Sequence, residues 1–293
     1  MKFYIVDAFT ETLFGGNPAG VVILDQGGDF PAEEIMRKTA AELRYSETAF
    51  IKRTGAEEFQ IRYFTPAAEV ELCGHATIGS FCALAAEGMV KPGKAYTNHT
   101  LAGSLNIEVG EGEVLMDMGR PETLGRVEDE AALDELYGVM GISRLSRGGE
   151  AGLLPELIST GLPDIMLPVA DLGALAAIRP DFPALSKLSE RYGVVGVHAF
   201  YAETGVDGGV HCRNFAPLYD IDEEAATGTS NGALTYYLYK NGLLKAGEET
   251  VFVQGEAMGR PSRIASRLAV EDGRVRIQVG GSAVILAEGD IRL

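Results

Sequence analysis

Residues 62–88 read RYFTPAAEVELCGHATIGSFCALAAEG, and residues 213–242 read RNFAPLYDIDEEAATGTSNGALTYYLYKNG. Both stretches begin with an R-x-F-x-P motif, and both end in an apolar run followed by a glycine. Further upstream, GNP at 16–18 resembles GLP at 161–163, each before an apolar run. The paired positions lie 145 to 154 residues apart and keep their order. Self-similarity of this kind predicts a duplicated fold.

The apolar runs predict one long buried helix in each copy. Residues 74–88 place Ile78, Phe81 and Leu84 at helical spacing and end at Gly88. Residues 228–242 do the same and end at Asn241-Gly242, which is typical of a C-cap. Strands are predicted before the first helix by KFYIVDAF (2–9), GVVIL (20–24), ETAFIKR (47–53) and FQIRYF (59–64).

We therefore expect an α/β (α+β) fold of two similar domains, each a rolled mixed β-sheet around a central helix. Residues 119–150 are polar with weak helical periodicity, so the crossover between domains is placed near 118–122. The first domain would comprise residues 1–118 and 283–293, with the C-terminal strand returning to it. The second domain would comprise residues 119–282.

Composition narrows the class of protein. The chain has 293 residues and a net charge of −17, which argues against nucleic-acid binding because that rests on Lys and Arg. Three cysteines make no disulfide framework and favour reduced thiols in the cytoplasm. No run approaches the length of a membrane span, and the N-terminus does not read as a signal peptide.

The N-terminal turn of each predicted helix, which we call a mouth, is the candidate site. The first mouth carries Cys73-Gly74-His75-Ala76 and the second carries Thr227-Gly228-Thr229-Ser230. Unpaired backbone N–H groups and the helix dipole attract a carboxylate or a developing oxyanion there. If the two domains face each other, both mouths could line one cleft. The alternative is that each glycine only makes a tight turn.

Ionisable residues beside the mouths could supply proton chemistry. A helix start is expected to lower the pKa of His75, and Cys73 is either a reactive low-pKa thiol or a small buried residue. In Ser46-Glu47-Thr48, an apolar pocket would raise the pKa of Glu47 and make it a proton carrier; otherwise Glu47 is a solvated edge residue. Glu224 closes the acidic run 222–224 just before the second mouth.

The motifs FTPAAEVELCGHAT, YSETAF, RNFAP, EEAATGTS and QGEAMGRPSRI resemble the PhzF-like isomerases of phenazine biosynthesis, relatives of diaminopimelate epimerase. The resemblance spans essentially the whole chain. It implies a homodimer, an active site between two domains, and no metal or organic cofactor. It also implies isomerisation of a dihydro-hydroxyanthranilic acid, with Glu47 as base and then acid. His75, Glu224 and Thr229 fall on the family's other site positions.

The second motif departs from the family pattern. The family's E-D-P-A-T-G-S is E-E-A-A-T-G-T at 223–229, which lengthens one carboxylate by a methylene. A displacement of that size alters the atom a side chain reaches, so the family's substrate is not carried over. The epimerase relatives use one cysteine at each mouth, whereas this chain has Cys73 and Thr227. Racemisation by a thiol pair is therefore disfavoured.

These observations predict a cofactor-independent isomerase that moves a proton on a small carboxylic acid. Racemisation through Cys73 with a non-thiol partner, or a non-catalytic small-acid binding protein, are the alternatives. A zinc site is disfavoured because the other histidines lie scattered at 99, 198 and 211. The predicted catalytic residues are Glu47, His75 and Glu224, and the predicted substrate-binding residues are Ser46, Cys73, Gly74, Ala76, Thr227, Gly228, Thr229 and Ser230.

Overall fold

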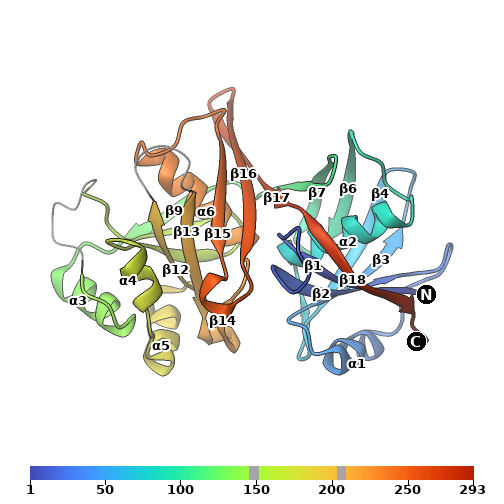
Figure 1. The fold of residues 1–293 in the computed structure, drawn as a ribbon, viewed down its shortest axis with the longest axis horizontal. Coiled ribbons are helices and arrows are strands. Elements are labelled where there is room, and N and C mark those ends of the chain that lie inside the picture. The colour runs from blue at the N-terminus through green and yellow to red at the C-terminus, as the bar shows by residue number, and fades with distance from the viewer. Residues whose placement is uncertain (145–151, 203–208) are drawn as a thin grey trace. The chain divides into compact units, whose positions relative to one another are not determined.

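The computed structural model describes residues 1–144, 152–202 and 209–293. The chain divides into two compact units (Figure 1). Unit 1 comprises Met1–Asp117 and Gly280–Leu293, and unit 2 comprises Met118–Val279. Each unit is described by itself below.

Unit 1 is a mixed sheet with two helices. Its C-terminal strand pairs antiparallel with the first strand of the chain, so both ends of the sequence belong to one sheet. The elements are β1 (Lys2–Ala8), β2 (Asn17–Ile23), α1 (Glu33–Leu43), β3 (Thr48–Arg53), β4 (Glu58–Phe64), β5 (Glu69–Val70), α2 (Gly74–Ala86), β6 (Lys94–Thr100), β7 (Gly103–Val109), β8 (Val114–Asp117) and β18 (Ala283–Asp290).

Unit 2 has the same kinds of element with a larger helical layer. Its last long strand, β17, crosses into unit 1 from Gly280 onward. The elements are β9 (Glu122–Arg126), α3 (Glu130–Val139), β10 (Glu156–Ser159), β11 (Pro163–Pro168), α4 (Leu172–Ala177), α5 (Phe182–Tyr192), β12 (Gly196–Ala202), β13 (Val210–Ala216), η1 (Pro217–Tyr219), β14 (Ile221–Glu224), α6 (Gly228–Lys240), β15 (Glu249–Gln254), η2 (Glu256–Met258), β16 (Ser262–Glu271) and β17 (Arg274–Gly281).

The two units share one pattern of strand pairing. In unit 1, β1–β2 and β3–β4 pair antiparallel, whereas β2–β3 and β4–β6 pair parallel. In unit 2, β10–β11 and β12–β13 pair antiparallel, whereas β11–β12 and β13–β15 pair parallel. This repetition confirms the predicted α/β fold of two similar halves.

The predicted apolar helices lie at the centre of each unit. Helix α2 packs against β1, β2 and β18, and α6 packs against β10, β11 and β16 (Figure 1). Both have 13 residues, and most of their side chains are buried. Each ends at a glycine with positive φ, Gly88 or Gly242, as the sequence predicts. Backbone hydrogen bonding continues past the cap. The N–H of Met89 donates to the Leu84 carbonyl, and that of Leu243 to the Leu238 carbonyl, each at 2.9 Å.

The repeated R-x-F-x-P motif has a structural cause. Arg62 lies 5.2 Å over the ring of Phe64, and Arg213 lies 4.9 Å over the ring of Phe215. Each guanidinium also binds a carboxylate through two nitrogens, Arg62 to Glu69 and Arg213 to Glu223. The fork geometry and the flat face of arginine serve both contacts at once.

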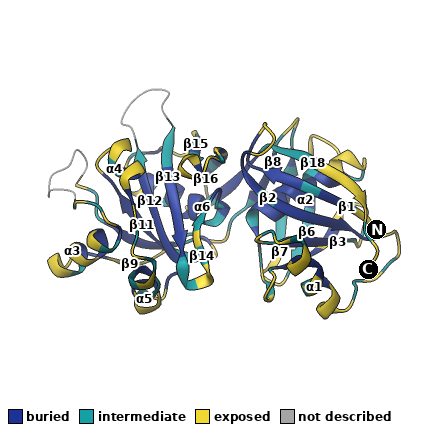
Figure 2. Ribbon diagram, turned by 60° about the horizontal axis from the view of Figure 1, so that its bottom comes forward, coloured by how far each residue is buried: buried dark blue, intermediate teal, exposed yellow. Residues whose placement is uncertain are grey.

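The helical layer of unit 2 encloses a second core. Helices α3, α4 and α5 bury Leu133, Leu175 and Leu185 together with residues of β11 and β12. In Figure 2 the strands β11, β12 and β13 are buried, whereas α3 and α5 carry exposed residues on their outer faces. The sequence did not predict α1, α4 or α5. The weak periodicity of 119–150 becomes β9 and α3, and its end lies outside the described residues. No helix in the described ranges is long and apolar enough to cross a membrane.

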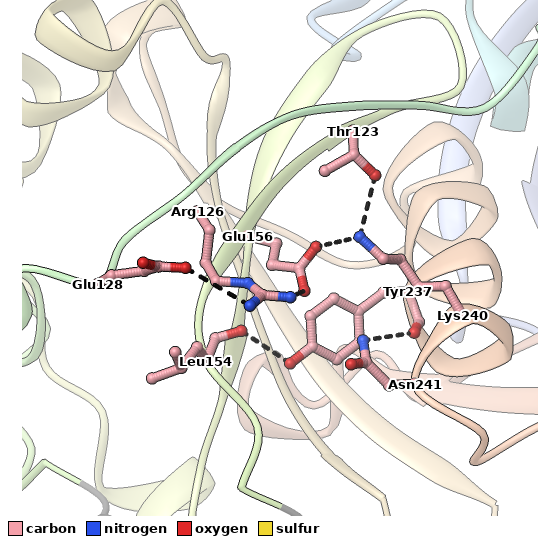
Figure 3. A network of polar contacts seen from close by, with 8 residues as sticks. All are labelled: Thr123, Arg126, Glu128, Leu154, Glu156, Tyr237, Lys240 and Asn241. Atoms are coloured by element: carbon pink, nitrogen blue, oxygen red, sulfur yellow. Dashed lines mark hydrogen bonds and ion pairs between the residues drawn. The ribbon is translucent and has the colours of Figure 1, made fainter.

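A buried carboxylate ties the C-terminal end of α6 to the sheet (Figure 3). Glu156 on β10 is 1% exposed and accepts from Arg126 at 3.0 Å and from Lys240 at 2.5 Å. Tyr237 donates its hydroxyl to the Leu154 carbonyl at 2.8 Å. This network fixes the end of α6 opposite the second mouth.

Candidate functional site

The first mouth opens at Cys73, the N-cap residue of α2. Thr77, one turn later, donates its hydroxyl to the Cys73 carbonyl at 2.7 Å. That hydroxyl lies 2.6 Å from the Tyr63 hydroxyl, which also accepts from Asn98 at 2.9 Å. All three partners are buried, so the mouth has a rigid polar support beneath it.

His75 is the centre of the first mouth and is 3% exposed. Its Nε2 lies 3.2 Å from Glu47 Oε2 and 3.3 Å from Ser46 Oγ. Its Nδ1 lies 3.1 Å from the side-chain amide of Asn17, whose oxygen has to face the ring when the imidazole is protonated. The Cys73 sulfur lies 3.5 Å from Nδ1 and 3.7 Å from Nε2. The structure thus groups Ser46, Glu47, Cys73 and His75 around one imidazole.

Glu47 and His75 form an ion pair, contrary to the charge states expected from the sequence. Burial alone would lower the pKa of His75, but hydrogen bonding to Cys73 and to the Glu47 carboxylate, together with the charge of that carboxylate, raises it well above its ordinary value. Burial alone would raise the pKa of Glu47, but His75, Ser46 and Cys73 lower it below its ordinary value. Both predicted directions were therefore wrong, because the facing partner outweighs burial and the helix dipole.

The Cys73 thiol is not activated. Burial, together with the nearby Glu47 charge, raises its pKa to about 11, and the side chain is 7% exposed. The thiol is therefore protonated at neutral pH. Of the two alternatives from the sequence, a reactive thiol or a small buried residue, Cys73 is the second.

A metal ion would draw on the same side chains. Glu47, Cys73 and His75 are the group of potential donors found in the described ranges, with ligand atoms within 4.8 Å of one another. The absence of a metal ion implied by the family resemblance therefore stays a prediction.

Asn17 was missed by the sequence analysis and lies 58 positions from His75. It begins β2, is 5% exposed and faces the imidazole. Gly16 before it has φ +61, and a Cβ there would lie 2.1 Å from the Ala8 carbonyl oxygen. Only glycine tolerates that turn. The sequence analysis used GNP at 16–18 only as evidence for the repeat, although the Asn17 side chain in it could have been considered as a partner of His75.

The second mouth opens at Thr227, the N-cap residue of α6. Its hydroxyl donates to Glu224 Oε2 at 2.5 Å. Asn231, one turn later, donates its side-chain amide to the Thr227 carbonyl at 2.9 Å, as Thr77 does in the first mouth. Glu223 is paired with Arg213, so Glu224 is the residue of the acidic run that faces this mouth.

The other predicted residues of the second mouth differ in accessibility. Gly228 is buried and Thr229 is half-buried, with its carbonyl accepting from the Thr160 hydroxyl at 2.9 Å. Ser230 is buried and donates its hydroxyl to Asp164. The Ser230 hydroxyl is therefore bonded within the core of unit 2, and its role in substrate binding stays a prediction. In the first mouth, Gly74 is half-buried and Ala76 is buried.

Comparison with known proteins supports one family. Residues 6–289 match the model of the PhzC-PhzF family, described as phenazine biosynthesis-like protein. An uncharacterised isomerase of Deinococcus radiodurans is 37% identical over 98% of this chain and 94% of its own length. A trans-2,3-dihydro-3-hydroxyanthranilate isomerase of Pseudomonas chlororaphis is 28% identical over 99% of both chains.

A solved structure agrees with these relatives. The PhzF-family phenazine biosynthesis protein of Bacillus anthracis has a TM-score of 0.85 and 26% identity, covering all of this chain and 99% of the other. The match therefore extends over both units and includes both mouths. The chain belongs to the PhzC-PhzF family of phenazine biosynthesis-like proteins and is an isomerase.

Proposed function

We propose that this isomerase moves a proton between two carbon atoms of a small carboxylic acid, with Glu47 as the proton carrier. The observation that carries the proposal is the Glu47–His75 pair at the N-terminus of α2, in which His75 is buried and the Glu47 side chain is 13% exposed. The lowered pKa of Glu47 keeps its carboxylate ionised at neutral pH, which is the form a general base needs.

The proposed reaction has two proton transfers. The Glu47 carboxylate removes a proton from a carbon next to an unsaturated group, and the electron pair of that C–H bond enters the conjugated system. His75, protonated because its pKa is raised, stabilises the negative charge that develops. Glu47 then returns the proton to another carbon, so a double bond moves and no oxidant or reductant is consumed.

Taken by itself, the second mouth suits an acid group, because backbone N–H groups at the start of α6, beside Thr227, Gly228 and Thr229, favour an anion. The Glu224 carboxylate would instead accept from a hydroxyl or amino group of the ligand. The raised pKa of Cys73 argues against the alternative of racemisation through its thiolate. The homodimer and the absence of a cofactor, which the family resemblance implies, stay predictions, and so does the cytoplasmic location, which the cysteine content favours.

The test is solvent deuterium exchange followed by NMR. The protein is incubated in D₂O with trans-2,3-dihydro-3-hydroxyanthranilate and with a panel of other small cyclic acids. We expect deuterium at a carbon of at least one acid, and a fall of at least about a hundredfold in Glu47→Gln, because general-base catalysis is worth 10² to 10⁴. Glu42→Gln, at an exposed position of α1, is the matched control.

Two results would contradict the proposal. Exchange that persists in Glu47→Gln at the wild-type rate would remove Glu47 as the proton carrier. Binding of acids without exchange at any carbon would favour the alternative of a non-catalytic binding protein on the same scaffold.

A further inference from the structure

We propose that Gln254 is a positioning residue that holds the second mouth in its binding shape. This inference rests on the proposed function of that mouth. Gln254 is the last residue of β15 and is fully buried. It lies 27 positions beyond the N-cap Thr227, outside the segment that forms the mouth, and reaches it across the fold of unit 2.

The Gln254 amide uses its full hydrogen-bonding capacity on the mouth. Its Nε2 donates to the Glu224 carbonyl at 2.7 Å and to the Thr227 hydroxyl at 3.1 Å. Its Oε1 accepts from the Thr227 N–H at 3.2 Å and from Asn231 at 2.9 Å, and the Cys212 thiol lies 3.9 Å from the same oxygen. A primary amide has two N–H donors and two acceptor sites, and the bonds with Glu224, Thr227 and Asn231 occupy all four.

These contacts fix the direction of the Thr227 hydroxyl. Because that oxygen accepts from Gln254, its proton points to the Glu224 carboxylate, to which it donates at 2.5 Å. Gln254 thereby sets both the main chain of Glu224 and the orientation of its side chain. A carboxylate held in this way is one requirement for binding a substrate in a single orientation.

The hairpin that carries Gln254 supports the same segment. Gly255 has φ +79, and a Cβ there would lie 2.7 Å from the Ala225 carbonyl and 2.3 Å from that of Arg260. Ser262 on β16 donates its hydroxyl to the Ala225 carbonyl at 2.7 Å. The QGEAMGRPSRI stretch at 254–264 therefore cradles residues 224–227.

The first copy of the fold places a different residue here. The offset of 154 residues that relates the two helices puts Thr100 at the position of Gln254, and Thr100 donates its hydroxyl to Gly103 within its own turn. The first mouth is supported from Tyr63 and Asn98 instead. The Gln254 amide is therefore specific to the copy that carries Glu224, and packing alone would not require it.

The test uses two substitutions of Gln254 and one control. Gln254→Met keeps the size and removes all four hydrogen bonds, and Gln254→Glu keeps the shape but removes the two donors. Thr235→Val, which removes the 2.8 Å bond to Ser266 farther along α6, is the control for loss of a buried polar contact. Thermal unfolding establishes that each variant is folded at the assay temperature.

Amide hydrogen exchange by NMR tests the contacts without any substrate. We expect the Thr227 N–H to exchange at least about tenfold faster in Gln254→Met, since its acceptor is gone, and at the wild-type rate in Thr235→Val. Equal exchange in wild type and Gln254→Met would overturn the proposal, because the mouth would then be held without Gln254.

Turnover separates positioning from mere structural support. With trans-2,3-dihydro-3-hydroxyanthranilate in D₂O, we expect kcat/KM to fall at least about tenfold in both Gln254 variants, as misplacement near a reacting group does. The ratio of Gln254→Glu to wild type should rise as pH falls, because the protonated carboxyl donates again, while the ratios for Gln254→Met and Thr235→Val stay flat.

The outcomes remain distinguishable. Faster amide exchange with unchanged kcat/KM and flat ratios would make Gln254 only structural and overturn its role in positioning. If wild type leaves this acid unchanged, the substrate is wrong, and the amide exchange rates by themselves decide whether Gln254 holds the mouth.

Discussion

Asp164 is predicted to make the protein less stable as the pH rises toward neutrality. It lies on β11, is 2% exposed and accepts the Ser230 hydroxyl. Its other carboxyl oxygen has no hydrogen-bond partner among the described residues. Burial raises the pKa of Asp164 from 3.8 to about 6, and the nearby polar groups of Ser230, Gly196 and Asn214 offset it only in part.

The sign and size follow from linkage. In the unfolded chain Asp164 loses its proton near its ordinary pKa, whereas in the fold it keeps the proton to about pH 6. The folded state therefore binds more protons between these values, and the free energy of unfolding falls as pH rises. The full effect is about 3 kcal/mol, of which about 1.4 kcal/mol lies between about pH 5 and about pH 7.5.

The assay compares Asp164→Asn with wild type by urea unfolding at those two pH values. The difference in unfolding free energy between the two proteins should shift by about 1.4 kcal/mol toward the variant as pH rises. Other titrating groups are common to both proteins and cancel in the difference. Asp222→Asn, at an exposed position, should show no such shift. A pH-independent difference for Asp164→Asn would refute the raised pKa and the reasoning from burial.

Two further substitutions test other parts of unit 2. Glu156→Gln should lower the free energy of unfolding by about 2 kcal/mol in urea titrations, because Arg126 and Lys240 would then face a neutral amide at a buried position. The control Glu249→Gln, in an exposed pair, should change it by under about 0.5 kcal/mol. Equal effects of the two substitutions would show that the Glu156 network does not stabilise the fold. Gly255→Ala should lower the free energy of unfolding by at least about 2 kcal/mol, because φ is positive there and the added Cβ would clash with two carbonyl oxygens. A thermal unfolding midpoint equal to that of wild type would contradict this.

The fold could be predicted from sequence because the same side-chain contacts are needed in both copies, so the same motif occurs twice. Arg62 and Arg213 each stack on a phenylalanine two positions later and bind a glutamate, so the motif reappears in both copies. The apolar helices end at Gly88 and Gly242 for a backbone reason, a positive φ. Helices α1, α4 and α5 were missed because each buries only one to three residues, which leaves little apolar periodicity in the sequence.

The structure groups the predicted residues of the first mouth, whose roles stay predictions, but their charge states were not predicted. The sequence brings Cys73 and His75 to one helix start, and the structure adds Glu47 from 28 positions upstream and Asn17 from 58. Burial and the helix dipole can be inferred from local sequence, and both argued for an uncharged site. The partner 3.2 Å away decides the charge state, and only the tertiary fold supplies that distance.

The two mouths show how one duplicated unit has diverged into two chemical environments. At the position four residues after each N-cap, Thr77 and Asn231 both return a hydrogen bond to the N-cap carbonyl, so the support of the helix start is the same. What differs is the residue that follows the glycine. In the first mouth this residue is His75, which pairs with the carboxylate of Glu47. In the second mouth it is Thr229, and the carboxylate of Glu224 is oriented instead by hydrogen bonds from Thr227 and Gln254. An ionised carboxylate can accept a proton from carbon, and a neutral amide cannot. Loss of Glu47 should therefore abolish proton exchange, while loss of Gln254 should weaken it through misplacement.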